Sequence, residues 1–196
     1  MFYMQQSNQY TLNYSFCQTD TTSVKGVNDG FDDAVRAEHG ICCVLGLDWL
    51  EAKLRNQAFV VTWQSIYANA RMFNTLEAAY DKVYANYCPN LRRGNIYSYD
   101  ITSANCLSAV NQIQNPGGIA IHLGVSLDRN DASGHMVCIV RNGRQYKMFD
   151  SNFGEYTASS ARACAHWLHT LCNTNRPERG RYLDWTQKLH AIQFSV

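Results

Sequence analysis

Apolar residues recur at helical spacing in the segment that begins near residue 42. Two neighbouring stripes follow this spacing and predict a helix with a wide apolar face. The stripes consist of Cys43, Leu47, Leu50 and Leu54, and of Cys42, Leu45, Gly46 and Trp49. Helical spacing, together with start and stop signals, also predicts helices over 74–87, 103–114 and about 157–172.

The period of the pattern changes to two after the turn Asn115-Pro116-Gly117-Gly118. Residues 119–125 alternate between large apolar and small or polar side chains, which predicts a half-buried strand. Further strands are expected over 135–140, 145–150 and about 190–195. Asn-Gly between two strand-like runs is a strong hairpin signal, and it places a two-residue turn at 142–143.

Helices early in the chain and strands late predict an α+β domain, in which the helices pack against an antiparallel sheet. Residues 1–40 are rich in Gln, Asn, Thr and Ser, have no strong period and carry a turn signal at 28–30. They are expected to form an irregular polar lead into the domain. Because no repeat or long linker is visible, the whole chain 1–196 is expected to be one domain.

Composition and charge argue against several classes of protein. Hydrophobic residues make up 46% of the 196 residues and charged residues 17%, so the chain can bury a core and is not of a disordered type. The net charge is +1, and the most basic stretch, Arg92-Arg93, is interpreted as a solvated turn, so no nucleic-acid partner is expected. No apolar run is long enough for a membrane span, and the first residues do not resemble a signal peptide.

The eight cysteines do not follow a metal-binding pattern, because no CxxC is present. His166, His169 and Cys172 share a predicted helix at spacings of three, but a helix surface with one buried thiol explains them better than half a metal site. Most cysteines are interpreted as reduced, small hydrophobic residues. The sequence therefore predicts neither a metal nor a cofactor.

The predicted hairpin brings together a histidine and an aspartate that could act as a catalytic pair. A turn at 142–143 makes His135 face Asp150 directly across the two strands, with Cβ atoms about 5 Å apart. A carboxylate at that distance can fix the tautomer of an imidazole and support its protonated form. A surface ion pair at the end of a sheet is the competing interpretation of the same two residues.

Cys42 is the candidate nucleophile for this His–Asp pair. It follows Gly40-Ile41 at the start of the predicted helix, where free amide groups and the helix dipole lower a thiol pKa. The apolar stripe that contains Cys43 favours a core position for that residue. Gly46 lies on the same face as Cys42 and would leave room above the helix, so the pattern favours Cys42 over Cys43.

Three short motifs in the order Cys, His, Asp resemble the YopT-type effector proteases. The segment from Gly40 to Trp49 resembles the G-x-C-x-x-L-x-x-x-W segment around the family's nucleophile. Gly134-His135 opens a hydrophobic strand, and Phe149-Asp150-Ser151-Asn152-Phe153-Gly154-Glu155 resembles the family's F-D-x-N-x-G segment. The Asn and Gly of this last segment also suit a simple turn, and Trp49 also suits core packing.

The resemblance implies a papain-like fold and a cysteine endopeptidase that cleaves a protein of a host or target cell. It implies export by a bacterial secretion system that needs no signal peptide, and action in the target-cell cytoplasm. By carry-over, Cys42 is the nucleophile, His135 the general base and then acid, and Asp150 the orienting carboxylate. Papain-like sites place Asn or Gln before the cysteine as an oxyanion donor; here Arg36 and His39 are the candidates.

Two other functions remain open on the same residues. Deamidases, transglutaminases and amidases share the thioester chemistry of a Cys–His pair and differ in the amide attacked or in the acceptor, water or an amine. A catalytically inactive binding module is the second alternative, and it is favoured by the absence of Asn or Gln at the usual oxyanion position. The presence of Cys42, His135 and Asp150 together favours the enzyme.

Overall fold

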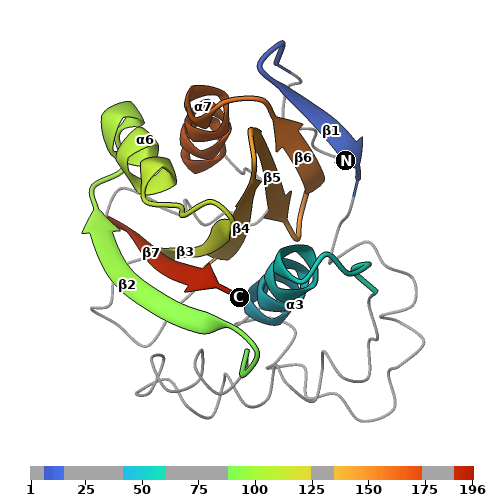
Figure 1. Cartoon of the computed structure of the whole chain (residues 1–196). Coiled ribbons are helices and arrows are strands. Elements are labelled where there is room, and N and C mark those ends of the chain that lie inside the picture. The colour runs from blue at the N-terminus through green and yellow to red at the C-terminus, as the bar shows by residue number, and fades with distance from the viewer. Residues whose placement is uncertain (1–6, 16–41, 61–87, 125–134, 174–187) are drawn as a thin grey trace, which may run out of the picture.

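The computed structural model describes residues 7–15, 42–60, 88–124, 135–173 and 188–196. Its seven strands form one antiparallel sheet in the order β1-β6-β5-β4-β3-β7-β2, with α3 on one face and α6 and α7 on the other (Figure 1). The elements in chain order are β1 (Tyr10–Tyr14), α3 (Cys42–Leu54), β2 (Arg92–Tyr99), α6 (Ser103–Asn111), β3 (Gly117–Gly124), β4 (His135–Asn142), β5 (Gln145–Asp150), β6 (Gly154–Ala158), α7 (Ala161–Cys172) and β7 (Lys188–Ser195).

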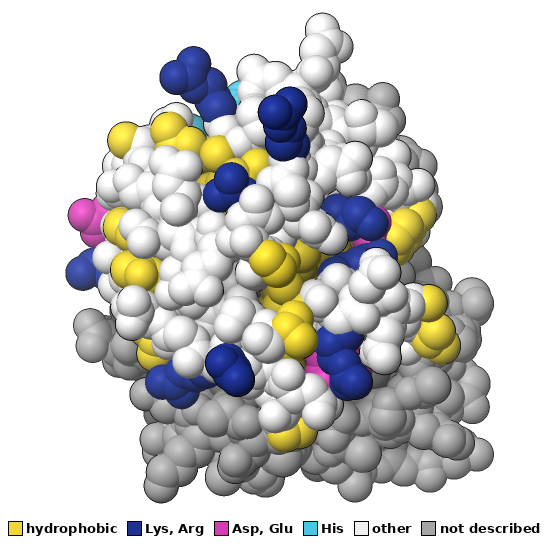
Figure 2. Space-filling view, viewed as in Figure 1, with side chains coloured by type: hydrophobic (Ala, Val, Ile, Leu, Met, Phe, Trp, Pro, Cys, Tyr) yellow, Lys and Arg dark blue, Asp and Glu magenta, His cyan; other side chains and the backbone are white. Residues whose placement is uncertain are grey.

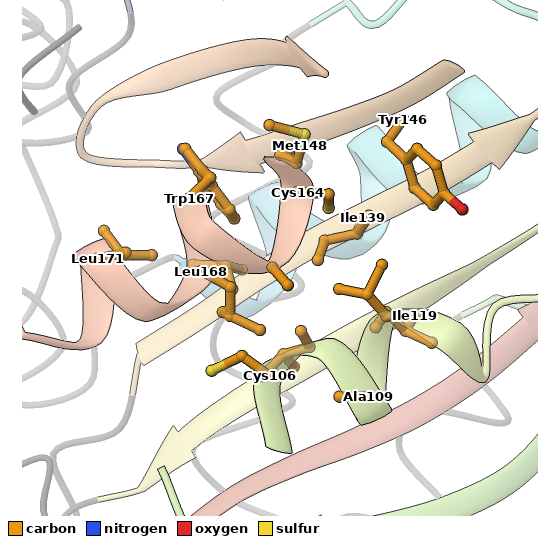
Figure 3. Close-up of a cluster of buried hydrophobic side chains, with 14 of the residues drawn as sticks. Cys106, Ala109, Ile119, Ile139, Tyr146, Met148, Cys164, Trp167, Leu168 and Leu171 are labelled. Atoms are coloured by element: carbon orange, nitrogen blue, oxygen red, sulfur yellow. The ribbon is translucent and has the colours of Figure 1, made fainter. Parts of the chain in front are cut away.

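The core consists of two hydrophobic layers separated by the sheet. Figure 3 shows the first layer, in which side chains of α6 and α7, such as Ala109 and Trp167, meet Ile119 and Ile139 of the central strands. The second layer lies between the opposite face and α3 and contains Ala120 of β3. The sheet is thus covered on both faces, with the helix that begins at residue 42 alone on one side among the described helices.

Burial of β3 corrects the expectation of a half-buried strand. Ile119 and Ile121 contribute to the layer under α6 and α7, whereas Ala120 contributes to the layer under α3. Residues 117–121 are all buried. The small side chains that the alternation pattern placed on the outer face in fact let α3 approach: a Cβ added to Gly118 would lie 2.7 Å from Leu50 Cδ1.

Three of the expected helices fall on described residues, and two of them begin at or close to the expected residue. The helix that starts at residue 42 runs over Cys42–Leu54, and the helix expected at 103–114 is α6, capped by the Thr102 side chain, which accepts from the Asn105 backbone N–H. The helix expected from about 157 was placed too early. Residues Gly154–Ala158 form β6, and α7 begins after Ser160, whose side chain accepts from the Ala163 N–H.

The polar lead contains a strand that the composition concealed. Tyr10–Tyr14 pairs with β6 as the edge strand β1, although only its first residue, Tyr10, is buried. An edge strand has one neighbour and can be largely polar, so it leaves little hydrophobic alternation in the sequence. Arg92-Arg93 is likewise not a turn, because both residues start the other edge strand, β2.

The order of elements is more mixed than helices followed by strands, because β1 and β2 come early and α7 comes late. The α+β class, with helices packed against an antiparallel sheet, is nevertheless confirmed. The helix expected over 74–87 and the turn at 28–30 lie outside the described residues.

The described surface carries charges of both signs. Figure 2 shows Lys and Arg side chains spread over the described part of one face, with small hydrophobic areas between them. Among the described residues, no helix combines the length and the apolar character needed to cross a membrane.

Candidate active site

Three elements bring the predicted site residues to one end of the sheet. His135 is the first residue of β4, Asp150 is the last residue of β5, and Cys42 is the first residue of α3. Because β4 and β5 are antiparallel neighbours, the start of one lies beside the end of the other. All three side chains are buried, with His135 4% exposed, Asp150 0% and Cys42 2%.

The hairpin between β4 and β5 has a different register from the predicted one. Asn142 pairs with Gln145, so the turn residues are Gly143 and Arg144, and Asp150 pairs with Val137 instead of His135. Gly143 has φ of 61°, whereas Arg144 has no positive φ, as in a type II′ turn with glycine at its first central position. The predicted turn at 142–143 is therefore wrong by one residue.

The contact between the two predicted side chains exists despite this correction. His135 Nε2 lies 2.9 Å from Asp150 Oδ2, in a buried contact. The shift of register moves the partner of Asp150 by two residues along β4, and side chains two residues apart lie on the same face of a strand. His135 and Asp150 are therefore diagonal neighbours on one face.

The turn after β5 holds the other oxygen of the carboxylate. The backbone N–H of Asn152 donates to Asp150 Oδ1 at 2.7 Å, and the N–H of Phe153 donates to the Asp150 carbonyl at 3.1 Å. Gly154 takes φ of 118°, which suits its place at the end of the turn. The motif around Asp150 thus acts as a turn that fixes the carboxylate in both plane and position.

Cys42 lies where several donors reach its sulfur. Its pKa is lowered well below the ordinary thiol value by a hydrogen bond from Cys43, which outweighs the opposing effect of burial. A hydrogen bond and the charge of His135, and a backbone hydrogen bond from Met136, lower the pKa further. These interactions favour the thiolate form of Cys42, as expected for a cysteine at a helix start.

Both adjacent cysteines contact the hydrophobic layer under α3. Cys42 is buried in it, and Cys43 is half-buried and packs against it, so Cys42 is the more deeply placed of the two. The pKa of Cys43 is raised by its hydrogen bond to Cys42 and by burial. Gly46 does not leave open space, because an added Cβ would lie 3.1 Å from Cys138 Sγ, so its role is to let α3 approach β4.

His135 shows the shift opposite to that of the thiol. Burial by itself would lower the imidazole pKa, but the charge and hydrogen bond of Asp150, together with Cys42, raise it to about 9. At neutral pH this environment therefore favours a thiolate beside an imidazolium. Such a pair can add sulfur to a carbonyl carbon and then deliver a proton to the leaving group.

Glu155, the last residue of the Asp150 motif, connects β6 to α3, the helix that begins at Cys42. Its Oε2 accepts from Trp49 Nε1 at 2.8 Å and lies 2.8 Å from Lys53 Nζ, while its Oε1 accepts from Asn13 of β1 at 2.9 Å. Burial would raise its pKa, but these three donors lower it overall. Sequence reasoning named Glu155 only as part of a motif and missed this role.

Trp49 packs in the core, as predicted. Its side chain is fully buried and stacks on Phe149 with ring centroids 5.4 Å apart. The stack joins α3 to β5 beside the Asp150 turn. The candidate oxyanion donors Arg36 and His39 lie outside the described residues.

The Cys–His–Asp cluster at a helix start and a sheet end resembles the arrangement that cysteine proteases use. The fold agrees with this class. The structure of the Pseudomonas avirulence protein AvrPphB superposes with a TM-score of 0.58 at 18% identity, covering 80% of this chain and 92% of that chain. PatoxP, a cysteine protease-like domain of the Photorhabdus asymbiotica toxin PaTox, gives a TM-score of 0.40 at 11% identity over 92% of this chain and 54% of that chain.

A peptidase family described as Yersinia/Haemophilus virulence surface antigen, the family of the YopT-type proteases, matches residues 92–183. The matched stretch contains His135 and Asp150, whereas Cys42 precedes it. No curated protein matches the sequence. The resemblance to the YopT-type family that the motifs indicated is confirmed by this match together with the AvrPphB-like fold.

Proposed function

We propose that this chain is a cysteine endopeptidase that hydrolyses a peptide bond of a target protein with Cys42, His135 and Asp150. The observation that carries the proposal is the buried 2.9 Å contact between His135 and Asp150 beside a thiol whose pKa is lowered. The raised pKa of His135, about 9, completes the thiolate–imidazolium pair. The YopT-type family match and the AvrPphB-like fold support the protease class.

The reaction follows from the positions of these atoms. The Cys42 thiolate attacks the carbonyl carbon of the scissile bond, and the negative charge moves to the carbonyl oxygen. The backbone N–H of Cys42 belongs to the first turn of α3, where amide groups point out of the helix end, and it can donate to that oxygen. His135 then gives its proton to the leaving amine as the carbon–nitrogen bond breaks, and a thioester remains on Cys42.

Hydrolysis of the thioester uses the same residues in reverse. Neutral His135 takes a proton from water, the resulting hydroxide adds to the thioester carbon, and sulfur leaves as the thiolate. Asp150 accepts from His135 through one oxygen and from the Asn152 N–H through the other. Its part is to orient the ring and to stabilise the imidazolium.

The site and the family match also support a role outside the producing cell. The family is described as a virulence surface antigen, and AvrPphB is described as an avirulence protein. We infer that the chain is exported by a signal-peptide-independent bacterial secretion system and cleaves a protein in the cytoplasm of a target cell. A reporter fusion that reaches target cells only from bacteria with an intact secretion system tests this inference; equal delivery without that system would contradict it.

The proposed chemistry is tested by labelling with iodoacetamide from pH 5 to 8, followed by peptide mapping of the modified cysteine. Fast labelling of Cys42 below pH 7 that is lost in His135→Ala supports the proposal. Slow labelling spread over several cysteines and unchanged in His135→Ala would contradict it. Cys138→Ser is the matched control, because Cys138 is buried and its pKa is raised by burial.

The reaction type is tested on proteins of a candidate target cell, by comparison of the wild type with Cys42→Ala. New peptide N-termini that depend on Cys42 identify a protease. A mass increase of about one unit on a glutamine, without chain cleavage, identifies a deamidase on the same triad. Absence of both, together with binding retained in Cys42→Ala, identifies a binding module.

A further inference from the structure

A second histidine lies under the start of α3. The helix runs along the central strands in matched steps. Leu50 lies against Gly118 of β3, because an added Cβ there would be 2.7 Å from Leu50 Cδ1. Four residues earlier in the helix, Gly46 lies against Cys138, which pairs with Ala120 two residues further along β3.

One more step of the same size locates the thiol. Four helical residues span about 6 Å and two strand residues about 6.6 Å, so the helix and the strands stay in step. The next step places Cys42 over the pair formed by His122 and Met136. The backbone hydrogen bond from Met136 to Cys42 agrees with this placement, as does the electrostatic interaction between Cys42 and His122.

The side chain of His122 faces α3 because of strand alternation. Ala120, two residues away, belongs to the hydrophobic layer under α3, and Ile121 belongs to the opposite layer. His122 and Ala120 therefore share a face. On the same strand pairings, His190 of β7 is the direct neighbour of His122.

We propose that His122 is a positioning residue of the active site, which faces the Cys42 thiol from β3 and sets the electrostatic environment of its sulfur. This inference rests on the proposed function, because it takes Cys42 as the nucleophile. His135 lies at the strand end and is held by Asp150. His122 lies one residue deeper, beneath the helix start, and the groups that act on its ionisation are a thiol and two imidazoles.

The groups around His122 determine when it carries a charge. Cys42 lies over it from α3, His190 is its direct neighbour on β7, and His135 precedes its pairing partner Met136 on β4. Lys188 acts on His190 further along β7. Burial lowers the pKa of His122, and the charges of His190 and His135 add to that effect against the opposing charge of Cys42. His122 is therefore neutral at neutral pH and takes up a proton only in acid.

This behaviour has a consequence for the thiol. At neutral pH the imidazolium of His135 balances the charge of the thiolate. When the pH falls, protonation of His122 adds a second positive charge beside the sulfur, and an adjacent opposite charge favours the ionised form. The thiolate of Cys42 consequently survives to lower pH than it would with His135 alone.

The test measures the rate of iodoacetamide labelling of Cys42 from pH 3.5 to 8 in the wild type, His122→Gln and His122→Asn. Both substitutions keep a polar side chain but cannot titrate. The midpoint of the acid limb is expected to rise by roughly one pH unit in both, the size of a neighbouring-charge effect, with the rate at pH 8 unchanged. Two variants, each checked by circular dichroism, protect the test against one that fails to fold.

His190→Gln is the matched control from the neighbouring strand. It removes a positive charge that disfavours protonation of His122, so the acid limb is expected to stay in place or move to lower pH. An upward shift in His190→Gln as large as that in the His122 variants would show a general loss of packing and would overturn the proposal.

The outcomes separate this inference from the proposed function. If wild-type Cys42 labels no faster than Cys43 at pH 6, the thiol is not activated and the proposed function itself fails. If the wild type labels fast and both His122 variants keep its acid limb, the triad stands and only the role of His122 is refuted.

Discussion

Replacement of Asp150 by asparagine removes one charge and keeps the shape of the site. Asp150 is completely buried, and its two oxygens are occupied by His135 Nε2 at 2.9 Å and the Asn152 N–H at 2.7 Å. An amide side chain at this position would retain an oxygen for one of these contacts but could no longer balance an imidazolium. The expected result of Asp150→Asn is loss of the charged form of His135.

The size of this loss follows from the shift of the histidine. The pKa of His135 is raised from 6.5 to about 9, a difference of 2.5 units. At ~1.4 kcal/mol per unit this is about 3 kcal/mol, or roughly a 300-fold change in the protonation equilibrium. Burial acts in the opposite direction, so the pKa in Asp150→Asn is expected to fall to the ordinary histidine value or below.

The assay is the pH dependence of iodoacetamide labelling at Cys42. In the wild type the thiolate–imidazolium pair spans the range from the lowered pKa of Cys42 up to about pH 9. In Asp150→Asn the imidazolium no longer stabilises the thiolate, so the acid limb moves up by about two units while labelling at high pH is kept. An unchanged acid limb in a folded Asp150→Asn protein would refute the role given to this carboxylate.

Substitutions at Cys43, Glu155 and Gly46, with Gly143→Ala as a control, test the surroundings of the thiol and the support of its helix. Cys43→Ala removes the hydrogen bond that lowers the pKa of Cys42 most, so the acid limb of Cys42 labelling should move to higher pH. Cys43→Ser keeps a hydrogen-bond donor and should leave the acid limb in place. Equal acid limbs in the two variants would contradict this reasoning. Glu155→Gln loses the ion pair with Lys53 and should lower the free energy of unfolding by about 2 kcal/mol in urea titrations. Because the pKa of Glu155 is lowered in the folded state, this difference should be full above about pH 4.5 and vanish at lower pH; a pH-independent difference would refute the assignment. Gly46→Val forces a side chain toward Cys138 and should slow labelling at neutral pH, whereas Gly143→Ala, with no atom within 4 Å, should cost about 1 kcal/mol at its positive φ and leave labelling unchanged.

The sequence predicts those elements in which apolar residues recur at a regular spacing. The helix from residue 42 and the strands β3, β4, β5 and β7 carry apolar side chains at helical or alternate spacing, and all are present. The edge strands β1 and β2 were missed, because a strand with one neighbour needs few apolar residues. β6 was also missed, and its last two residues were assigned to the helix expected over about 157–172.

The His–Asp contact was predictable although the register was not. The Asn-Gly dipeptide indicates a turn, but it does not decide which residue takes the first central position. In the structure Gly143 takes the first central position, where φ is positive. An error of two residues in pairing preserves the face of every side chain, so His135 still reaches Asp150.

The arrangement around the thiol could not be predicted from the pattern. Cys42 and Cys43 are adjacent and both lie in apolar stripes, and only the packing of α3 on β4 decides which is buried. His122 looks like the polar half of an alternating strand. Its position under the helix depends on the close approach that Gly118 and Gly46 allow, a long-range effect without a local signal.

The matched steps of α3 and the strands also limit how this chain can change in length. Cys42, Gly46 and Leu50 form a row that lies over three successive pairs of β3 and β4, namely His122–Met136, Ala120–Cys138 and Gly118–Val140. Deletion of one residue between Cys42 and Leu50 would rotate the sulfur by about 100° around the helix axis and shift it by ~1.5 Å. The number of residues between Cys42 and Leu50 is therefore fixed by the packing of this row on β3 and β4.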